Sequence, residues 1–383
     1  MIDFNILIVG AGMYVTGRGS DSNGTILPAL VNYSKKRKIN IFIVSTKNST
    51  INRAKKKISS FIKNISTNIS INYFPNSKKN FNYKDIISKY DIHCAIVSVP
   101  DHIHFEICSY IGNKGIHCLV VKPMCLKTIE AKKLISCYKK NEIYGAVEFH
   151  KRFDEANLSI KSLIKENRLG KLQYASITYS QKKIIPENIF KLWSHKSNVF
   201  NYLGVHYVDL IKFLTNFKPY ELLAFGQKDY LASKNIHTYD SIQVMIKWLR
   251  DDKKPFVSSH LTNWIDPNSS TAMSNQYISI IGTKGRIDSD QKNRGLKLNY
   301  EDNNLDINPY FSSTISLNNE LHIFGYGIKS IQNFLDNVYK LKNKKISLNY
   351  LNKHTPSFEN CLDTVKIIEA VEKSLKNNKK IKV

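Results

Sequence analysis

Residues 4–12 read Phe-Asn-Ile-Leu-Ile-Val-Gly-Ala-Gly, a short apolar run that meets two glycines. This is the expected form of a buried parallel strand that ends in a tight turn. Further short apolar runs follow at 39–44, 94–99, 117–121 and 143–149. Stretches with helical spacing lie between them at 53–65, 83–90 and 126–141. Strands that alternate with helices predict βαβ units and a parallel sheet.

The pattern changes after about residue 150. Strand-like segments then follow one another at 172–180, 220–225, 241–249, 256–264, 277–282 and 296–300. Consecutive strands of this kind favour a mainly antiparallel sheet. Helical spacing returns at 198–214, 328–341 and 357–377. The fold class predicted for the chain is therefore α/β, with an N-terminal parallel sheet and a C-terminal domain built on an open, mainly antiparallel sheet.

The charge of the chain is strongly positive, with 57 Lys and Arg against 31 Asp and Glu and a net charge of +26. Such a balance can indicate a polyanionic partner. However, only 8 of the basic residues are Arg, the residue suited to bidentate phosphate and base contacts, and 39 residues are Asn. The excess of Lys and Asn indicates a composition bias on solvated surfaces, so we expect no specific nucleic-acid partner.

The six cysteines are scattered, with no C-x-x-C pair and no short metal-ligand spacing. They predict reduced, mostly buried thiols in a cytoplasmic protein, and no metal site. The apolar runs are far shorter than the roughly 18 residues of a membrane span, and no basic stretch precedes the first of them. We therefore expect neither membrane attachment nor a signal peptide.

The glycine turn is the first candidate for binding. Gly10-x-Gly12 after a strand lets backbone N–H groups approach a pyrophosphate. The third glycine of the usual fingerprint would fall at Val15, and a segment of extra residues, 14–23, precedes the next helical pattern. A purely structural glycine turn remains the alternative.

The end of the second strand bears on the choice of cofactor. A carboxylate there normally binds the ribose hydroxyls of NAD. Here Val44 is followed by Ser45, Thr46 and Lys47, without an acid, and Arg53 comes later. Hydroxyls with cations suit a 2′-phosphate, so NADP is slightly favoured over NAD; the alternative is that these cations reflect the Lys-rich composition.

Two further strands end in polar residues. One continues from Val99 through Pro100 to His104, and the other ends Val121-Lys122-Pro123. Ligands of open α/β sheets bind at these carboxyl ends, and partial burial can lower the pKa of a lysine toward catalytic use. The alternative for Lys122 is a solvated lysine at a strand end.

The expected helix 198–214 carries a third group of polar residues. His206 and Asp209 lie one turn apart, and Tyr202 lies four residues before His206, so all three share a face of a regular helix. An imidazole beside a sugar hydroxyl can act as general base near neutral pH. The alternative is a histidine that only pairs with Asp209.

These features in this order resemble the glucose-fructose oxidoreductase/inositol dehydrogenase (Gfo/Idh/MocA) family of NAD(P)-dependent oxidoreductases. The matching stretches are 10–12, 99–104, 121–123, 148–154, 204–209, 281–285, 357–360 and 367–371. Two residues differ from the family pattern: Val121 stands where the family has Glu before its Lys-Pro, and Tyr202 stands where it often has Asp.

The resemblance implies a dinucleotide-binding Rossmann domain at 1–125 and a substrate and oligomerisation domain at 126–383, in which the helix at about 357–377 is a candidate for packing back on the first domain. It implies Lys122 and His206 as catalytic residues, with His206 exchanging the hydroxyl proton while a hydride moves to or from the nicotinamide. Together with the motifs, it gives expected cofactor-binding residues Gly10, Gly12, Met13, Ser45, Thr46, Lys47, Val99, Pro100, His104, Val121 and Lys122. The expected substrate-binding residues are Lys122, His150, Lys151, Tyr202, His206 and Asp209.

The predicted function is hydride transfer between NAD(P) and a hydroxyl or carbonyl of a sugar, polyol or sugar derivative, including acidic or nucleotide-linked ones. The expected assembly is a homo-oligomer, a dimer or tetramer. The alternative function is a catalytically silent NAD(P)-binding sensor or scaffold, suggested by Val121 and Tyr202.

Overall fold

The computed structural model describes residues 4–18, 22–63, 65, 67–76, 81–318 and 320–383. The chain divides into two compact units. The first unit comprises 1–125, 129–150 and 310–361, and the second comprises 126–128, 151–309 and 362–383.

The first unit contains a six-stranded parallel sheet in the order β3-β2-β1-β4-β5-β6. Its strands are β1 (Phe4–Val9), β2 (Ile39–Val44), β3 (Ile69–Phe74), β4 (Cys94–Val97), β5 (His117–Val121) and β6 (Gly145–Glu148). The order reverses direction between β1 and β4, and ligands of doubly wound sheets bind at such a switch point. The parallel sheet predicted from the apolar runs is confirmed.

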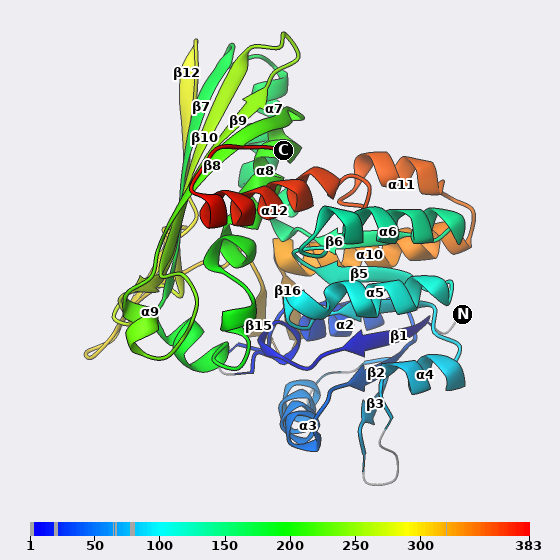
Figure 1. The fold of residues 1–383 in the computed structure, drawn as a ribbon. Helices are drawn as coiled ribbons and strands as arrows, with labels where there is room; N and C mark the ends of the chain where they lie inside the picture. Colours follow the sequence, from blue (N-terminus) through cyan, green and yellow to red (C-terminus); the bar gives the residue numbers. More distant parts are fainter. Residues whose placement is uncertain (1–3, 19–21, 64, 66, 77–80, 319) are drawn as a thin grey trace. The chain divides into compact units, whose positions relative to one another are not determined.

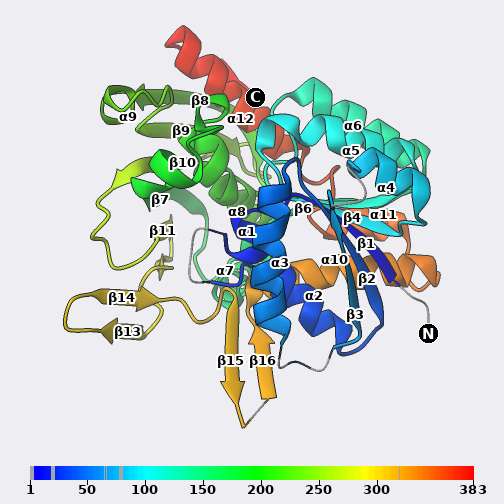
Figure 2. The ribbon, with the colours of Figure 1, turned by 90° about the horizontal axis from the view of Figure 1, so that it is seen from below.

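The longer helices of this unit bury apolar faces. In α3, for example, Ile51, Ala54 and Ile58 recur at helical spacing and are buried. The helical elements of the unit are α1 (Met13–Thr16), α2 (Ile26–Ser34), α3 (Asn48–Ile62), α4 (Tyr83–Lys89), η1 (Asp101–Ile103), α5 (His104–Asn113), α6 (Thr128–Lys140), α10 (Tyr326–Lys342) and α11 (Leu348–His354). Figure 2 shows α2 and α10 side by side. A hairpin of β15 (Ser313–Leu317) and β16 (Glu320–Phe324) precedes α10.

Two features of the first unit were not anticipated. The edge strand β3 alternates exposed and half-buried residues, so it lacks the apolar run of a central strand. The extra segment 14–23 contains a short helical turn, α1, which ends at Gly17 with a φ of 68°. Residues 19–21 of this segment lie outside the described residues.

The second unit is built on a seven-stranded sheet in the order β12-β11-β7-β10-β9-β8-β17. Its neighbouring strands are antiparallel except for the parallel pair β7 and β10, so the mainly antiparallel sheet is confirmed. The strands are β7 (Leu172–Lys182), β8 (Lys218–Gln227), β9 (Ser241–Leu249), β10 (Pro255–Asp266), β11 (Ser274–Gly282), β12 (Gly285–Asp290) and β17 (Ile381–Lys382). A separate hairpin pairs β13 (Leu296–Asn299) with β14 (Asn304–Ile307).

The two faces of this sheet differ. Period-two alternation buries one face, which includes Trp248, Trp264 and Ile278, whereas Phe225 and Met245 on the other face are exposed. The helical elements of the unit are η2 (His150–Phe153), which leads into it, α7 (Glu155–Lys165), η3 (Ile185–Ile189), η4 (Ser194–Lys196), η5 (Phe200–Gly204), α8 (Val205–Thr215), α9 (Tyr230–Ser233) and α12 (Leu362–Asn377). Figure 1 shows β7, β10, β9 and β8 as neighbours, and α12 packs on β8.

None of the helices in the described parts of the chain has both the length and the apolar composition that crossing a membrane requires.

Candidate functional site

The two glycines of the turn after β1 differ in the space around them: a Cβ would be blocked at Gly10 and would meet no atom at Gly12. Gly10 has a φ of +106°, and a Cβ there would lie 2.1 Å from the carbonyl oxygen of Ser98. Gly12 precedes α1 in extended conformation, and a Cβ on it would meet no atom within 4 Å. The chain therefore requires Gly10 for its own packing, whereas Gly12 leaves backbone open, as close approach of a dinucleotide phosphate needs.

The carboxyl end of β2 carries hydroxyl groups and cations. Ser45, Thr46 and Lys47 follow the strand, and Lys47 is the residue before α3. Lys57 of α3 donates to the carbonyl oxygen of Gly17 at 2.7 Å, which ties the extra segment to this helix. Burial and the neighbouring charge of Arg53 lower the pKa of Arg18. Arg18 of the extra segment and Arg53 of α3 therefore lie close enough for their charges to interact.

The ends of β4 and β5 are joined by His104. Its Nδ1 lies 2.7 Å from the carbonyl oxygen of Pro123, and its Nε2 lies 2.9 Å from that of Val99. Burial lowers the pKa of His104, and the charge of Asp101 opposes this effect. His104 therefore braces the two loops that carry the expected cofactor-binding residues Val99, Pro100 and Lys122.

Lys122 is a buried ammonium group at the end of β5, with 8% of the residue exposed. Burial lowers the pKa of Lys122 to about 7, and the charges of Asp101 and Glu148 oppose the shift. A lysine in this state can give or take a proton near neutral pH. The structure places Lys122 in a buried position rather than at a solvated strand end.

A hydrogen-bonded cluster lies at the end of β6. The carboxylate of Glu148 accepts a bond of 2.5 Å from Ser330 and lies 3.2 Å from Nδ1 of His150. The hydroxyl of Tyr14, from the extra segment, lies 3.4 Å from the same nitrogen. The ring of His150 also packs 5.0 Å from that of Phe311. His150, which the sequence predicts as a substrate-binding residue, thus belongs to a hydrogen-bonded cluster in the first unit.

His206 lies at the start of α8, in the second unit. A π-helical turn, η5, precedes α8, and such turns often occur at functional sites. His206 is 3% exposed, and its ring lies 6.1 Å from that of Tyr179. The wider π turn alters the four-residue spacing between Tyr202 and His206 that a regular helix would give.

Asp209 of α8 is bound by an arginine. Nε of Arg152 donates to one carboxylate oxygen of Asp209 at 2.8 Å, and Nη2 donates to the other at 2.6 Å. Both residues are buried, and this fork geometry is typical of strong charge-assisted bonds. The carboxylate expected to bind substrate thus holds α8 to the chain that follows β6.

Tyr202 belongs to an aromatic cluster. Its ring lies 4.7 Å from Phe190, 6.0 Å from Trp193 and 5.9 Å from Trp264. The position where the resemblance places an acid is therefore occupied by a phenol among aromatic rings.

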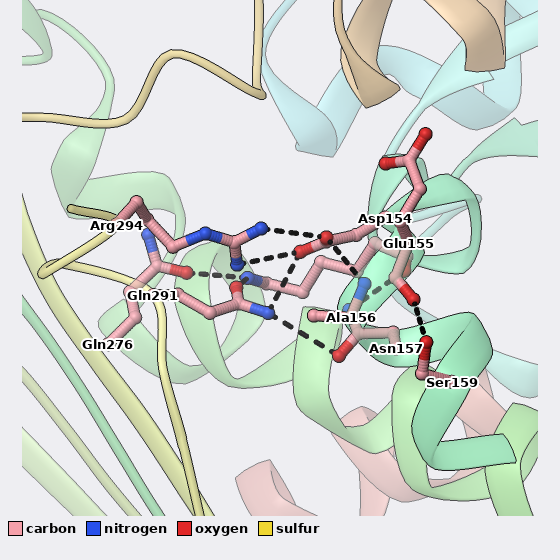
Figure 3. Close-up of polar contacts among 9 residues, drawn as sticks. Asp154, Glu155, Ala156, Asn157, Ser159, Gln276, Gln291 and Arg294 are labelled. Atoms are coloured by element: carbon pink, nitrogen blue, oxygen red, sulfur yellow. Dashed lines mark hydrogen bonds and ion pairs between the residues drawn. The ribbon is translucent and has the colours of Figure 1, made fainter. Parts of the chain in front are cut away.

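Lys151 is the centre of a polar network in the second unit. Its ammonium group donates to the side-chain oxygens of Gln276 and Gln291, and lies 4.7 Å from the centre of the Tyr207 ring. Burial lowers the pKa of Lys151 to about 7, opposed by the charge of Asp154. Figure 3 shows Gln291 directed at Asp154 and Asn157, and Arg294 paired with Asp154.

Several residues of these clusters were absent from the expected site. Glu148 is the last residue of β6, and Asp101 begins η1 shortly after β4, so the rule that found Lys122 could have found them. Arg152 stands in the stretch that carries the resemblance. Its pairing with Asp209 cannot be predicted from the sequence, because the two residues are far apart in the chain. Ser330 and Gln291 come from distant segments, and no local pattern marks them.

Two sequence models of one family match the chain. The model described as an oxidoreductase family with an NAD-binding Rossmann fold matches residues 4–149. The model of the GFO/IDH/MocA C-terminal domain matches residues 157–288.

Individual relatives share a low sequence identity with this chain. A levoglucosan dehydrogenase of Pseudarthrobacter phenanthrenivorans is 25% identical over 34% of this chain, and an inositol 2-dehydrogenase of Rhizobium meliloti is 21% identical over 51%. These matches span 35% and 57% of the length of the two relatives. The structure of a scyllo-inositol dehydrogenase from Lactobacillus casei with NAD(H) and scyllo-inositol superposes with a TM-score of 0.66, at 15% identity, over 100% of this chain and 99% of the other. The last comparison shows a shared fold.

Proposed function

Because the chain belongs to the Gfo/Idh/MocA family of oxidoreductases, we propose that it transfers a hydride between a nicotinamide cofactor and a hydroxyl or carbonyl group of a sugar or polyol. The observation that carries the proposal is Lys122, a buried ammonium group with a pKa of about 7 at the carboxyl end of a parallel strand. It lies in the segment that the NAD-binding model matches.

The first unit offers what a dinucleotide needs. Gly12 leaves its backbone open, and Lys122 supplies a donor at the end of β5. The bound nicotinamide would supply the hydride acceptor or donor. Lys122, as an ammonium ion, would hydrogen-bond the reacting oxygen and stabilise negative charge that develops on it.

We assign proton exchange to His206. During oxidation of an alcohol, the hydroxyl proton would pass to the imidazole as the hydride leaves the carbon, and reduction would reverse both transfers. The position of His206 in the first turn of α8, which follows a π-helical turn, supports this assignment. Asp209 is bound by Arg152, so it would act by holding α8 rather than by binding substrate.

Neutral sugars and polyols are the favoured substrates within this proposal. The ammonium group of Lys151 donates to two amide oxygens and lies over an aromatic ring. These contacts within the chain account for its charge without an acidic substrate. The relatives named for levoglucosan and inositol act on neutral compounds of this class. His150 and Tyr202 remain candidates for contacts with substrate hydroxyls or apolar ring faces.

We propose NADP as the preferred cofactor. Ser45, Thr46 and Lys47 follow β2 without an acid, and Arg18 lies close enough to Arg53 for the two charges to interact. Such a set suits a phosphate on the adenosine ribose better than free hydroxyls. In a titration, Arg53→Ala is expected to weaken NADP binding about tenfold while changing NAD binding little. Equal weakening of both cofactors would contradict the preference.

Thermal melting tests cofactor binding. A ligand that binds only the native state raises its apparent stability with concentration. We expect NADP and NADPH to raise the melting temperature, and Gly12→Ala to reduce the rise at a given cofactor concentration. A chain that melts identically with NAD, NADP and their reduced forms would contradict the proposal.

Turnover separates an enzyme from a silent binding protein. Cofactor reduction is measured with a panel of inositols, anhydrosugars and aldoses. We expect Lys122→Ala and His206→Ala each to reduce the rate by at least about a hundredfold. Cofactor binding without turnover on any of these compounds would favour a sensor or scaffold.

A further inference from the structure

The residue opposite Val121 is an acid. Strands β5 and β6 pair in parallel, and their register places Val121 against Glu148. Residues opposite each other in a sheet project from the same face, so the side chain of Glu148 neighbours that of Val121. The acid that the family resemblance places at 121 thus has a counterpart one strand away.

The carboxylate of Glu148 is fixed in place. Glu148 is 1% exposed, yet Ser330 donates to one oxygen at 2.5 Å and Nδ1 of His150 lies 3.2 Å from the other. Burial opposes ionisation, but the charge of His150 and hydrogen bonds from His150, Ser330 and Tyr14 outweigh it and lower the pKa of Glu148. Glu148 is therefore a buried anion with partners from three separate segments.

Lys122 directly follows the position that Glu148 faces. The charged groups that act on Lys122 are Asp101 from η1 and Glu148 from β6. The imidazole of His104, from α5, has its own pKa lowered by burial and by the charge of Lys122. The two carboxylates favour the ammonium form of Lys122, whereas burial disfavours it. If both carboxylates were absent, a lysine buried to this extent would be mostly neutral at pH 7.

We propose that Glu148 is a positioning residue of the oxidoreductase site: its carboxylate, held by Ser330, His150 and Tyr14, keeps Lys122 charged and takes the place of an acid at 121. The inference rests on the proposed function of Lys122. It also assigns a role to Tyr14 of the extra segment, because this side chain helps to position the carboxylate of Glu148.

The direct test follows the ionisation of Lys122 in the cofactor-free protein. Acetic anhydride acylates the neutral amine only, so trace labelling at a series of pH values, read by peptide mass spectrometry, gives a midpoint for Lys122. We expect a midpoint near 7 in the wild type and a lower one in Glu148→Gln. Each pH unit of downward shift raises the neutral fraction well below the midpoint about tenfold.

The reciprocal variant separates charge from packing. Val121→Glu combined with Glu148→Gln returns the carboxylate to the neighbouring strand, and we expect it to move the midpoint back toward the wild-type value. Glu106→Gln, which removes an exposed carboxylate of α5, serves as the control and should leave the midpoint unchanged. If Glu148→Gln does not fold, Ser330→Ala keeps the carboxylate but loosens it, and a smaller downward shift is expected.

A folded Glu148→Gln or Ser330→Ala protein whose Lys122 midpoint equals that of the wild type would overturn the inference, because a purely structural acid affects stability alone. The labelling needs no turnover, so it gives an answer even if the proposed function fails. If turnover is found, the high-pH limb of its pH profile should move downward in Glu148→Gln, in parallel with the labelling midpoint.

Discussion

Gly10 and Gly12 lie two residues apart and have opposite surroundings. Gly10→Ala would place a methyl group 2.1 Å from the oxygen of Ser98 at a φ of +106°. We expect it to lower the free energy of unfolding by at least about 2 kcal/mol, measured by urea denaturation.

Gly12→Ala is the matched control. Its backbone is extended and the space around it is open, so stability should change by less than about 0.5 kcal/mol. Cofactor affinity should fall about tenfold or more, because the new methyl group occupies the space that a phosphate needs. Destabilisation by Gly12→Ala without loss of affinity would assign it a structural role only.

Lys151 gives a second prediction for single residues. Its pKa is about 7 in the folded chain against an ordinary 10.5, so between these values the unfolded chain binds more protons. The free energy of unfolding should therefore rise with pH across this window, by up to about 1.4 kcal/mol per pH unit from this group. Lys151→Met should flatten the rise, whereas Lys165→Met, at an exposed position of α7, should not. Equal slopes in wild type and Lys151→Met would refute the assignment.

At the scale of elements, the buried ion pair of Arg152 with Asp209 helps to hold α8. Arg152→Leu leaves the carboxylate of Asp209 buried without its partner, which should cost about 3–5 kcal/mol of stability. Replacing both residues by Leu should cost much less, because no lone charge remains. Thermal melting of the three proteins compares them, and a double variant as unstable as Arg152→Leu would show that the loss comes from packing.

The elements that the sequence predicted are those with a plain apolar signal. The bounds of β1, β2, β5 and β9 match their apolar runs because these strands are buried on at least one face. The sequence pattern does not reveal β3, because its residues at the sheet edge alternate between exposed and half-buried, or β12, because its residues are mostly polar. The π turn before α8 has no periodicity that a sequence pattern could reveal.

The candidate site was predictable to a similar extent. Residues directly after buried strands, such as Lys122 and Ser45, follow from position alone. The partners of Glu148 come from residues far apart in the chain, and only the folded arrangement brings Tyr14 and Ser330 to it. Likewise, helical spacing does not predict the ion pair between Arg152 and Asp209.

For the whole molecule, the outer face of the second sheet predicts self-association. Phe225 and Met245 are 59% and 57% exposed on β8 and β9, and Tyr277, Tyr174 and Leu261 are exposed on strands of the same sheet. An apolar surface of this kind usually has a partner, and we propose a second copy of the chain.

Light scattering after size-exclusion chromatography tests this assembly. Phe225→Lys with Met245→Lys should convert a dimer or tetramer to a smaller species. Phe324→Lys, at an exposed residue of the β16 hairpin in the other unit, should leave the mass unchanged. A wild-type chain that is monomeric at high concentration would contradict the proposal.

The central claim is that this chain is an NAD(P)-dependent oxidoreductase whose reaction depends on Lys122 and His206. Its most direct test is the rate of cofactor reduction with neutral sugars and polyols, compared between wild type, Lys122→Ala and His206→Ala at matched cofactor saturation. The account predicts turnover by the wild type with at least one compound and a loss of at least about a hundredfold in each variant. Turnover that survives both substitutions would contradict it.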